Sequence, residues 1–282
     1  MTDTTQSPET RSARRLGGLA VYCERRSLAM LLLGFAAGLP NLLVYDTLSA
    51  WLRDAGVTLE VIGFFALATL TYALKFVWAP LLDRTNIPLL TRWLGHRRSW
   101  MLATQGVIIL GLWMISGTNP MGSLGLVAAF AVMVGFFGAT QDIAIDAWRI
   151  EAADDARQGV MAAAYQLGYR VAVIVAGAVP LVLAQIYNWN LSYAIMACLM
   201  GLGVLGVLLA PREQQHIVRA IPVGDIPSRP WLERLEWVIR LALIFIAALI
   251  IGTGLTDQPD ALLWAFGGVL SPETHAAFTA GM

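Results

Sequence analysis

Residues 124–148 read LGLVAAFAVMVGFFGATQDIAIDAW, a largely apolar run that holds no charge until Asp142. The hydrocarbon core of a bilayer is about 30 Å thick, and a helix needs roughly 20 apolar residues to cross it. The run is long enough, and its glycines and alanines are the small residues that membrane helices use where they pack closely. We therefore predict a transmembrane helix over Leu124–Trp148, with two carboxylates near its end.

The composition of the whole chain agrees with a membrane protein. Of the 282 residues, 57% are hydrophobic and 13% are charged, against about 45–50% and about 25% in ordinary soluble domains. The formal net charge is zero, which gives no reason to expect a nucleic-acid partner. The two cysteines, Cys23 and Cys198, form no C-x-x-C pattern, so neither a disulfide framework nor a zinc site is expected.

Seven segments are long and apolar enough to be predicted as transmembrane helices. They are Leu28–Trp51, Val61–Leu82, Trp100–Ser116, Leu124–Trp148, Val160–Ile186, Leu191–Leu209 and Val238–Leu255. Pro40 and Asn41 interrupt the first of them, which predicts either a kink used in gating or a break that the helix tolerates. The fold class that follows is an all-α integral membrane protein.

Arginines gather in every second connection between these segments. Cytoplasmic loops of membrane proteins carry the excess of Lys and Arg, so the arginine-rich connections are predicted to share the cytoplasmic face. The clusters are Arg11, Arg14, Arg15, Arg25 and Arg26, then Arg84, Arg92, Arg97 and Arg98, then Arg149 and Arg157, and finally Arg212 and Arg219. They alternate as six helices with both ends in the cytoplasm require.

These predictions divide the chain into four parts. Residues 1–26 form a cytoplasmic tail, which we expect to be retained because no A-x-A-type cleavage site follows the first apolar segment. Residues 27–210 form a six-helix transmembrane bundle, and residues 211–236 form a cytoplasmic linker that holds four prolines. Residues 237–282 form an extra transmembrane helix with part of the following loop.

Ionisable side chains lie inside the predicted helices, where each costs roughly 2.5–3.5 kcal/mol unless it meets a partner or a wet cavity. They are Lys75, the single lysine of the chain, together with Asp142, Asp146 and Arg170. At 1.5 Å per residue, Lys75 and Asp142 lie at matching depths on different helices, which predicts an ion pair. Asp146 is two residues from Trp148, so it is equally well explained as a helix-end residue that reaches the interface.

Polar neighbours on the same helix faces extend this set. Asp142 and Asp146 are spaced i, i+4 and share one face, as do Gln166 and Arg170. We predict a buried polar seam between the second, fourth and fifth helices, made of Lys75, Gln141, Asp142, Asp146, Gln166, Tyr169 and Arg170. Such a seam suits the binding of a polar solute, a proton relay, or both.

Motifs of other protein classes are missing from the sequence. There is no G-x-x-x-x-G-K-[ST], so an ATP-driven pump is not expected, and there is no G-x-S-x-G nucleophile motif. The histidines His96, His216 and His275 lie in predicted loops and form no H-E-x-x-H metal site. We therefore expect neither an enzyme nor a bound cofactor or metal.

Three segments together resemble a known family. The second helix ends in LKFVWAPLLDR (74–84), the fourth in ATQDIAIDAW (139–148), and the fifth carries LGYR (167–170). This combination is similar to the AmpG-type muropeptide permeases of the major facilitator superfamily, from about Gly34 to Pro211. The resemblance implies that residues 27–210 are the six-helix N-terminal bundle of a major facilitator fold.

The connection between the second and third helices also resembles a loop motif of that superfamily. Asp83 and Arg84 open it, and Gly95 precedes Arg97 and Arg98. Ala79 stands where a glycine is usual, and residues are inserted before Gly95, as in AmpG-like proteins. The resemblance implies that Asp83, Arg84, Arg97 and Arg98 form a cytoplasmic gating motif.

The function that the resemblance implies is proton-driven import of peptidoglycan-derived anhydromuropeptides, which are GlcNAc-anhydroMurNAc-peptides, across the bacterial inner membrane. Alternating access would expose the solute to one side and then the other as two bundles rock. Asp46, where AmpG-like proteins often have a small or hydroxyl residue, departs from the family pattern. Two alternatives stay open: an acetyl-CoA transporter-like permease, and a non-transporting membrane assembly protein on the same scaffold.

A major facilitator transporter needs two facing bundles, and the predicted helices supply one bundle and a seventh helix. We read Val238–Leu255 as the first of an inserted pair and expect the chain to stop inside that insert. The expected partners are therefore the lipid bilayer, protons, a small glycopeptide, and either a missing C-terminal half or a second copy.

Overall fold

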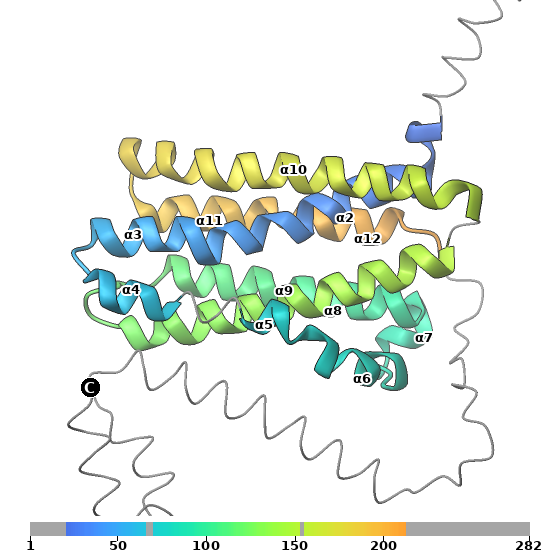
Figure 1. Ribbon diagram of the computed structural model, residues 1–282, viewed down its shortest axis with the longest axis horizontal. Coiled ribbons are helices and arrows are strands. Elements are labelled where there is room, and N and C mark those ends of the chain that lie inside the picture. The colour runs from blue at the N-terminus through green and yellow to red at the C-terminus, as the bar shows by residue number, and fades with distance from the viewer. Residues whose placement is uncertain (1–20, 66–69, 153–154, 213–282) are drawn as a thin grey trace, which may run out of the picture.

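A computed structural model describes residues 21–65, 70–152 and 155–212 of the chain. Five of its helices are long and apolar enough to cross a membrane: Arg25–Asp54, His96–Ser116, Leu124–Ala152, Arg157–Ile186 and Trp189–Leu209. They run side by side as one elongated bundle (Figure 1). Each contains most or all of one predicted segment, which confirms the all-α membrane fold. The predicted segment Val238–Leu255 lies outside the described residues.

The first helix is continuous through its Pro-Asn interruption. It consists of α2 (Arg25–Leu42), a π-helical turn (Leu43–Thr47) and α3 (Leu48–Asp54). Proline removes one backbone donor and crowds the preceding turn, and the wider π-helical turn directly after it lets the helix continue. Such turns are frequent at functional sites. The helix therefore continues through the Pro-Asn interruption, and a role of this interruption in gating stays a prediction.

The predicted helix Val61–Leu82 is divided, so the prediction of one continuous helix is wrong. The described residues form α4 (Leu59–Phe65), α5 (Leu70–Ala73), a single 3-10 turn (Lys75–Val77) and α6 (Ala79–Arg84). Pro80 is the physical reason near α6, because its ring conflicts with the carbonyl group four residues earlier in a continuous helix. The backbone of Trp78, at φ −106° and ψ −2°, makes the corner instead.

The other helices are α7 (Leu90–Leu94), α8 (His96–Ser116), α9 (Leu124–Ala152), α10 (Asp155–Ile186), α11 (Trp189–Leu199) and α12 (Gly201–Leu209). Helix α2 is central, since it packs against α10, α12 and α9, whereas α10 lies along one edge of the bundle (Figure 1). Burial agrees with these positions. In the most apolar 18-residue stretch of the first helix 72% of the residues are buried, whereas in that of Arg157–Ile186 only 22% are buried.

Glycines let α2 and α10 approach with their backbones in contact. A Cβ atom on Gly34 would overlap the carbonyl group of Tyr165, and one on Gly168 would overlap the carbonyl group of Leu31. Gly38, four residues after Gly34, approaches the carbonyl oxygen of Tyr169, 2.7 Å from where its Cβ would be. The G-x-x-x-G pattern of the first helix is therefore a packing surface for the fifth.

We expect Gly168→Ala to destabilise the protein by about 1–3 kcal/mol, the usual cost of overpacking, because the overlapping atoms belong to the backbone and cannot rotate away. The matched control is Gly106→Ala on α8, where an added Cβ meets nothing within 4 Å. That change should be neutral or slightly stabilising, since alanine favours a helix over glycine. Thermal unfolding in detergent compares the two, and equal melting temperatures would contradict the backbone contact.

Candidate functional site

The predicted ion pair between the second and fourth transmembrane segments forms. Lys75 begins the 3-10 turn before α6, and its Nζ atom lies 3.8 Å from Oδ2 of Asp142 on α9. The side chain of Asp142 is 12% exposed and that of Lys75 is 38% exposed. The Asp142 side chain is thus nearly enclosed, while the Lys75 side chain is partly exposed.

Tyrosines of α10 lie next to the carboxylate, and of these only Tyr169 was predicted from the sequence. The hydroxyl group of Tyr165 donates to Oδ1 of Asp142 at 3.5 Å, and the ring of Tyr169, one turn further along α10, lies 6.3 Å from that of Tyr165. Asn41 of α2 donates from Nδ2 to the Tyr169 hydroxyl group at 2.7 Å. The signals for these residues were the i, i+4 spacing of the two tyrosines and the interruption next to Asn41.

Tyr72 of α5 completes this group. Its ring packs edge-on against the ring of Tyr45 at a centroid distance of 6.1 Å. Its hydroxyl group is buried without a hydrogen-bond partner in the described part of the chain, and it fills the space where Gly138 of α9 lacks a side chain. Helices α2, α9 and α10 and the divided second segment therefore meet around one polar cluster.

The structure leaves part of the predicted seam out of this cluster. The side chains of Gln166 and Arg170 are exposed on α10, because their face of the helix points away from α2. Asp146 pairs with Arg149 on its own helix at 3.4 Å and is half exposed. Gln141 is fully buried and away from solvent. A single seam that joins all seven residues is therefore wrong for this arrangement.

Removal of either charge of the Lys75–Asp142 pair should cost stability. Lys75→Met or Asp142→Asn alone leaves the other charge without its partner inside the bundle, which we expect to cost about 1–3 kcal/mol. The double variant should recover much of that loss, as measured by thermal unfolding and by the yield of folded protein in the membrane. Strictly additive losses over the double-mutant cycle would mean that the two side chains do not interact.

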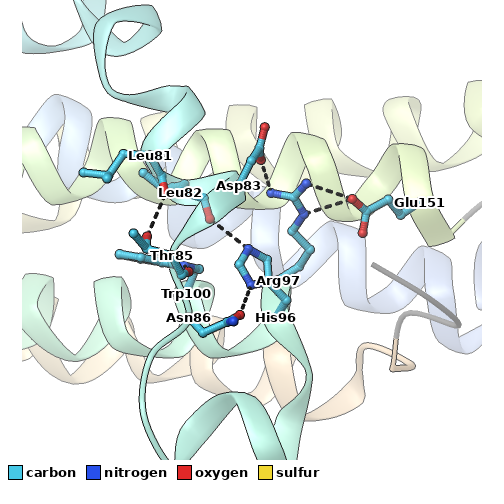
Figure 2. Close-up of polar contacts among 9 residues, drawn as sticks. All are labelled: Leu81, Leu82, Asp83, Thr85, Asn86, His96, Arg97, Trp100 and Glu151. Carbon is cyan, nitrogen blue, oxygen red and sulfur yellow. Dashed lines mark hydrogen bonds and ion pairs between the residues drawn. The ribbon is translucent and has the colours of Figure 1, made fainter. Parts of the chain in front are cut away.

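A second charged network joins α6, α8 and α9 at the end of the bundle where the loop motif lies. The guanidinium group of Arg97 donates to Oδ1 of Asp83 at 2.5 Å and to Oε1 of Glu151 at 2.8 and 3.0 Å (Figure 2). The Arg97 side chain is only 7% exposed. Glu151 is not among the residues predicted from the sequence, where its only signal is its position one turn beyond Trp148.

His96 holds the connection between α6 and α8 beside this network. Its Nε2 atom donates to the carbonyl group of Leu82 at 2.8 Å, and its Nδ1 atom meets the Asn86 side chain at 2.9 Å (Figure 2). The indole of Trp100 donates to the carbonyl group of Thr85 at 2.9 Å. His96 is the first residue of α8 and is buried, so its prediction as a loop residue was wrong.

The other two arginines of the predicted gating motif behave differently. Arg98 donates to the carbonyl groups of Val207 at 3.0 Å and Leu208 at 3.5 Å, so it covers the C-terminal end of α12, where the helix dipole favours a cation. Arg84 is exposed at the surface. Of the four residues, Asp83 and Arg97 are thus directly joined.

Comparison with known proteins places this architecture in a family. The chain matches the Major Facilitator Superfamily over residues 27–278. It is 36% identical to "Putative transporter AmpG 4" of Rickettsia felis over 210 residues, which are 74% of this chain and 50% of that protein. It is 38% identical to the "Anhydromuropeptide permease" of Escherichia coli K12 over 200 residues, 71% of this chain and 40% of that protein.

The similarity to AmpG transporters is therefore confirmed, and this chain spans half or less of the length of these relatives. The five membrane-crossing helices and the matched family agree on a multi-pass membrane protein whose family consists of transporters. The chain belongs to the Major Facilitator Superfamily.

Proposed function

We propose that the chain is the N-terminal half of a secondary transporter that imports anhydromuropeptides across the bacterial inner membrane by proton-driven alternating access. The observation that carries the proposal is the Lys75–Asp142 pair, an ion pair inside a membrane-spanning bundle. Ionisable residues in that position mark solute paths and proton relays. The similarity to the Escherichia coli relative supports the choice of solute.

The groups around the pair fit a polar, sugar-containing solute. Tyr165, Tyr169 and Asn41 offer hydroxyl and amide groups that both donate and accept hydrogen bonds, next to aromatic rings with apolar faces. Arg170 and Gln166 are exposed on α10, and we place them on the surface that faces the second bundle. There the forked guanidinium group of Arg170 suits a carboxylate of the peptide.

The Arg97 network supplies the gate in this proposal. Arg97 ties α8 to α6 through Asp83 and to α9 through Glu151, so this end of the bundle moves as a unit only while the three groups stay together. A rocking bundle needs such a rigid end. Arg98 serves the same end of the bundle by holding α12 rather than by contacting Asp83.

Uptake of labelled anhydromuropeptide in bacteria without their own permease tests the proposal. The chain alone should give no uptake, because one bundle cannot close a cavity on both sides. The chain fused to the C-terminal half of the Escherichia coli relative should give uptake that a protonophore abolishes. Protonophore-sensitive uptake by the 282-residue chain alone would instead support a working homodimer, and uptake of acetyl-CoA instead of anhydromuropeptide would support the alternative permease.

The orientation is a separate part of the proposal, with the N-terminus and the connection after α12 in the cytoplasm. In a background without Cys23 and Cys198, single cysteines at Thr118 or Asn188 should react with an impermeant thiol reagent added to intact cells. Cysteines at Thr5 or Gln214 should react only after the cells are opened. The reverse pattern would invert the topology.

A further inference from the structure

Two glutamines are fully buried inside the bundle, one on each of two neighbouring helices. Gln105 of α8 and Gln141 of α9 have exposed fractions of 0%. None of their four polar side-chain atoms has a hydrogen-bond partner within the described residues. A primary amide offers two donors and an accepting oxygen, and burial of such groups without hydrogen bonds is strongly unfavourable.

The two amides lie at the same depth. Helices α8 and α9 are joined by the short connection 117–123 and pack against each other in opposite directions. Their register is set at Gly111, where an added Cβ would meet the side chains of Val134 and Met133. Gln105 is six residues before Gly111 and Gln141 is seven residues after Val134, so an equal rise per residue brings both glutamines to one level.

The amide of Gln105 also reaches a third and a fourth helix. A Cβ on Gly203 of α12 would lie 2.7 Å from Nε2 and 3.1 Å from Cδ of Gln105, and it would overlap the Cβ of Ala36 on α2. The amide therefore occupies the junction of α2, α8 and α12, in the space that the missing side chain of Gly203 leaves. This junction lies inside the bundle, because Gln105 is fully buried.

We propose that Gln105 and Gln141 bind internal water, one or two molecules enclosed between α2, α8, α9 and α12. A buried water molecule makes two to four hydrogen bonds and both donates and accepts, as these amides require. A cation would satisfy only the two amide oxygens and leave both NH₂ groups unpaired. The site does not depend on which solute the transporter carries.

The water site assigns Gln141 a role different from solute binding. Consecutive residues of a helix point about 100° apart, so Asp142 reaches Lys75 and Tyr165 while Gln141 is directed into the interior. Water that bridges Gln141 to α8 fixes the rotation of α9 about its axis. That rotation is what presents Asp142 to the ion pair, so Gln141 is a positioning residue.

Hydroxyl-radical footprinting of the chain in lipid nanodiscs tests the water site, because radiolysis of an enclosed water molecule oxidises the side chains beside it. Met101 lies one turn before Gln105 on α8 and is fully buried, and Met196 of α11 is a fully buried methionine in the other hydrophobic cluster. We expect Met101 to be oxidised several-fold faster than Met196. Equal, slow rates would overturn the proposal.

The double variant Gln105→Leu with Gln141→Leu provides a second test of the water site. Leucine has a similar volume and no polar atom, so the Met101 rate should fall to that of Met196 while the elution volume of the protein in size-exclusion chromatography stays unchanged. If Met101 stays fast in the folded double variant, the water is not held by these amides and the proposal fails. A variant that does not fold leaves the comparison of Met101 with Met196 in the unmodified chain as the deciding result.

Discussion

Replacement of Asp142 by asparagine is expected to reduce uptake by the restored transporter to the level of cells that lack a permease. Asparagine keeps the shape of the side chain but neither accepts a proton nor pairs with Lys75, whose Nζ atom lies 3.8 Å away. Proton-driven transport needs a group that changes charge along the path. The loss should therefore appear in the initial rate and should not be overcome by a higher solute concentration.

Asp46→Asn is the matched control. Asp46 belongs to the π-helical turn of the first helix and its side chain is exposed, so the same chemical change there should leave uptake close to that of the unmodified transporter. Both variants are compared at equal amounts of protein in the membrane, with and without a protonophore. Undiminished, protonophore-sensitive uptake by Asp142→Asn would show that the proton is carried elsewhere.

Arg97→Met is expected to give the largest loss of stability among single substitutions in the loop motif, about 3 kcal/mol. Removal of one partner from a buried charge network leaves the others uncompensated, at roughly 3–5 kcal/mol, and the lower end applies because Asp83 is 46% exposed. Most of the loss of stability should come from Glu151, because its carboxylate is only 22% exposed and loses its ion pair with Arg97. Thermal unfolding in detergent should report a clear fall in melting temperature.

The control for this prediction is Arg84→Met, the same substitution at an exposed arginine of the same motif. Its effect should stay within about 0.5 kcal/mol, as for most surface changes. A second variant, Arg97→Met combined with Glu151→Gln, should regain part of the stability because it removes the carboxylate that has lost the Arg97 guanidinium group. If Arg97→Met and Arg84→Met melt alike, the network does not hold this end of the bundle together.

The Lys75–Asp142 pair shows which property of a side chain can be predicted by counting residues along a helix. Lys75 and Asp142 were matched from the rise per residue alone, and they meet in the structure. Gln166 and Arg170 are placed in the seam by their shared helix face, yet both are exposed on α10. Depth along a helix follows from counting residues, whereas the direction of a side chain depends on how the helix is rotated against its neighbours.

The division of the predicted helix Val61–Leu82 is a feature that its hydropathy does not predict. Val61–Leu82 is apolar enough to cross a membrane, and only Pro80 in it argued against a continuous helix. The corner at Trp78 is held by contacts from α9, where Thr140 accepts a hydrogen bond from the Trp78 indole at 3.1 Å. A contact between residues 62 positions apart is invisible to a hydropathy pattern.

The sequence by itself determined the class of the protein, the position of five membrane-crossing helices and the set of charged residues inside them. These properties belong to single segments, because a transmembrane helix satisfies its own backbone hydrogen bonds and is recognised by length and composition. The tertiary structure alone decided that Glu151 is a partner of Arg97, that Arg98 covers the end of α12, and that Gln141 is fully enclosed. Those outcomes depend on the rotation and close approach of whole helices, which glycine contacts between α2 and α10 set across more than 130 positions of the chain.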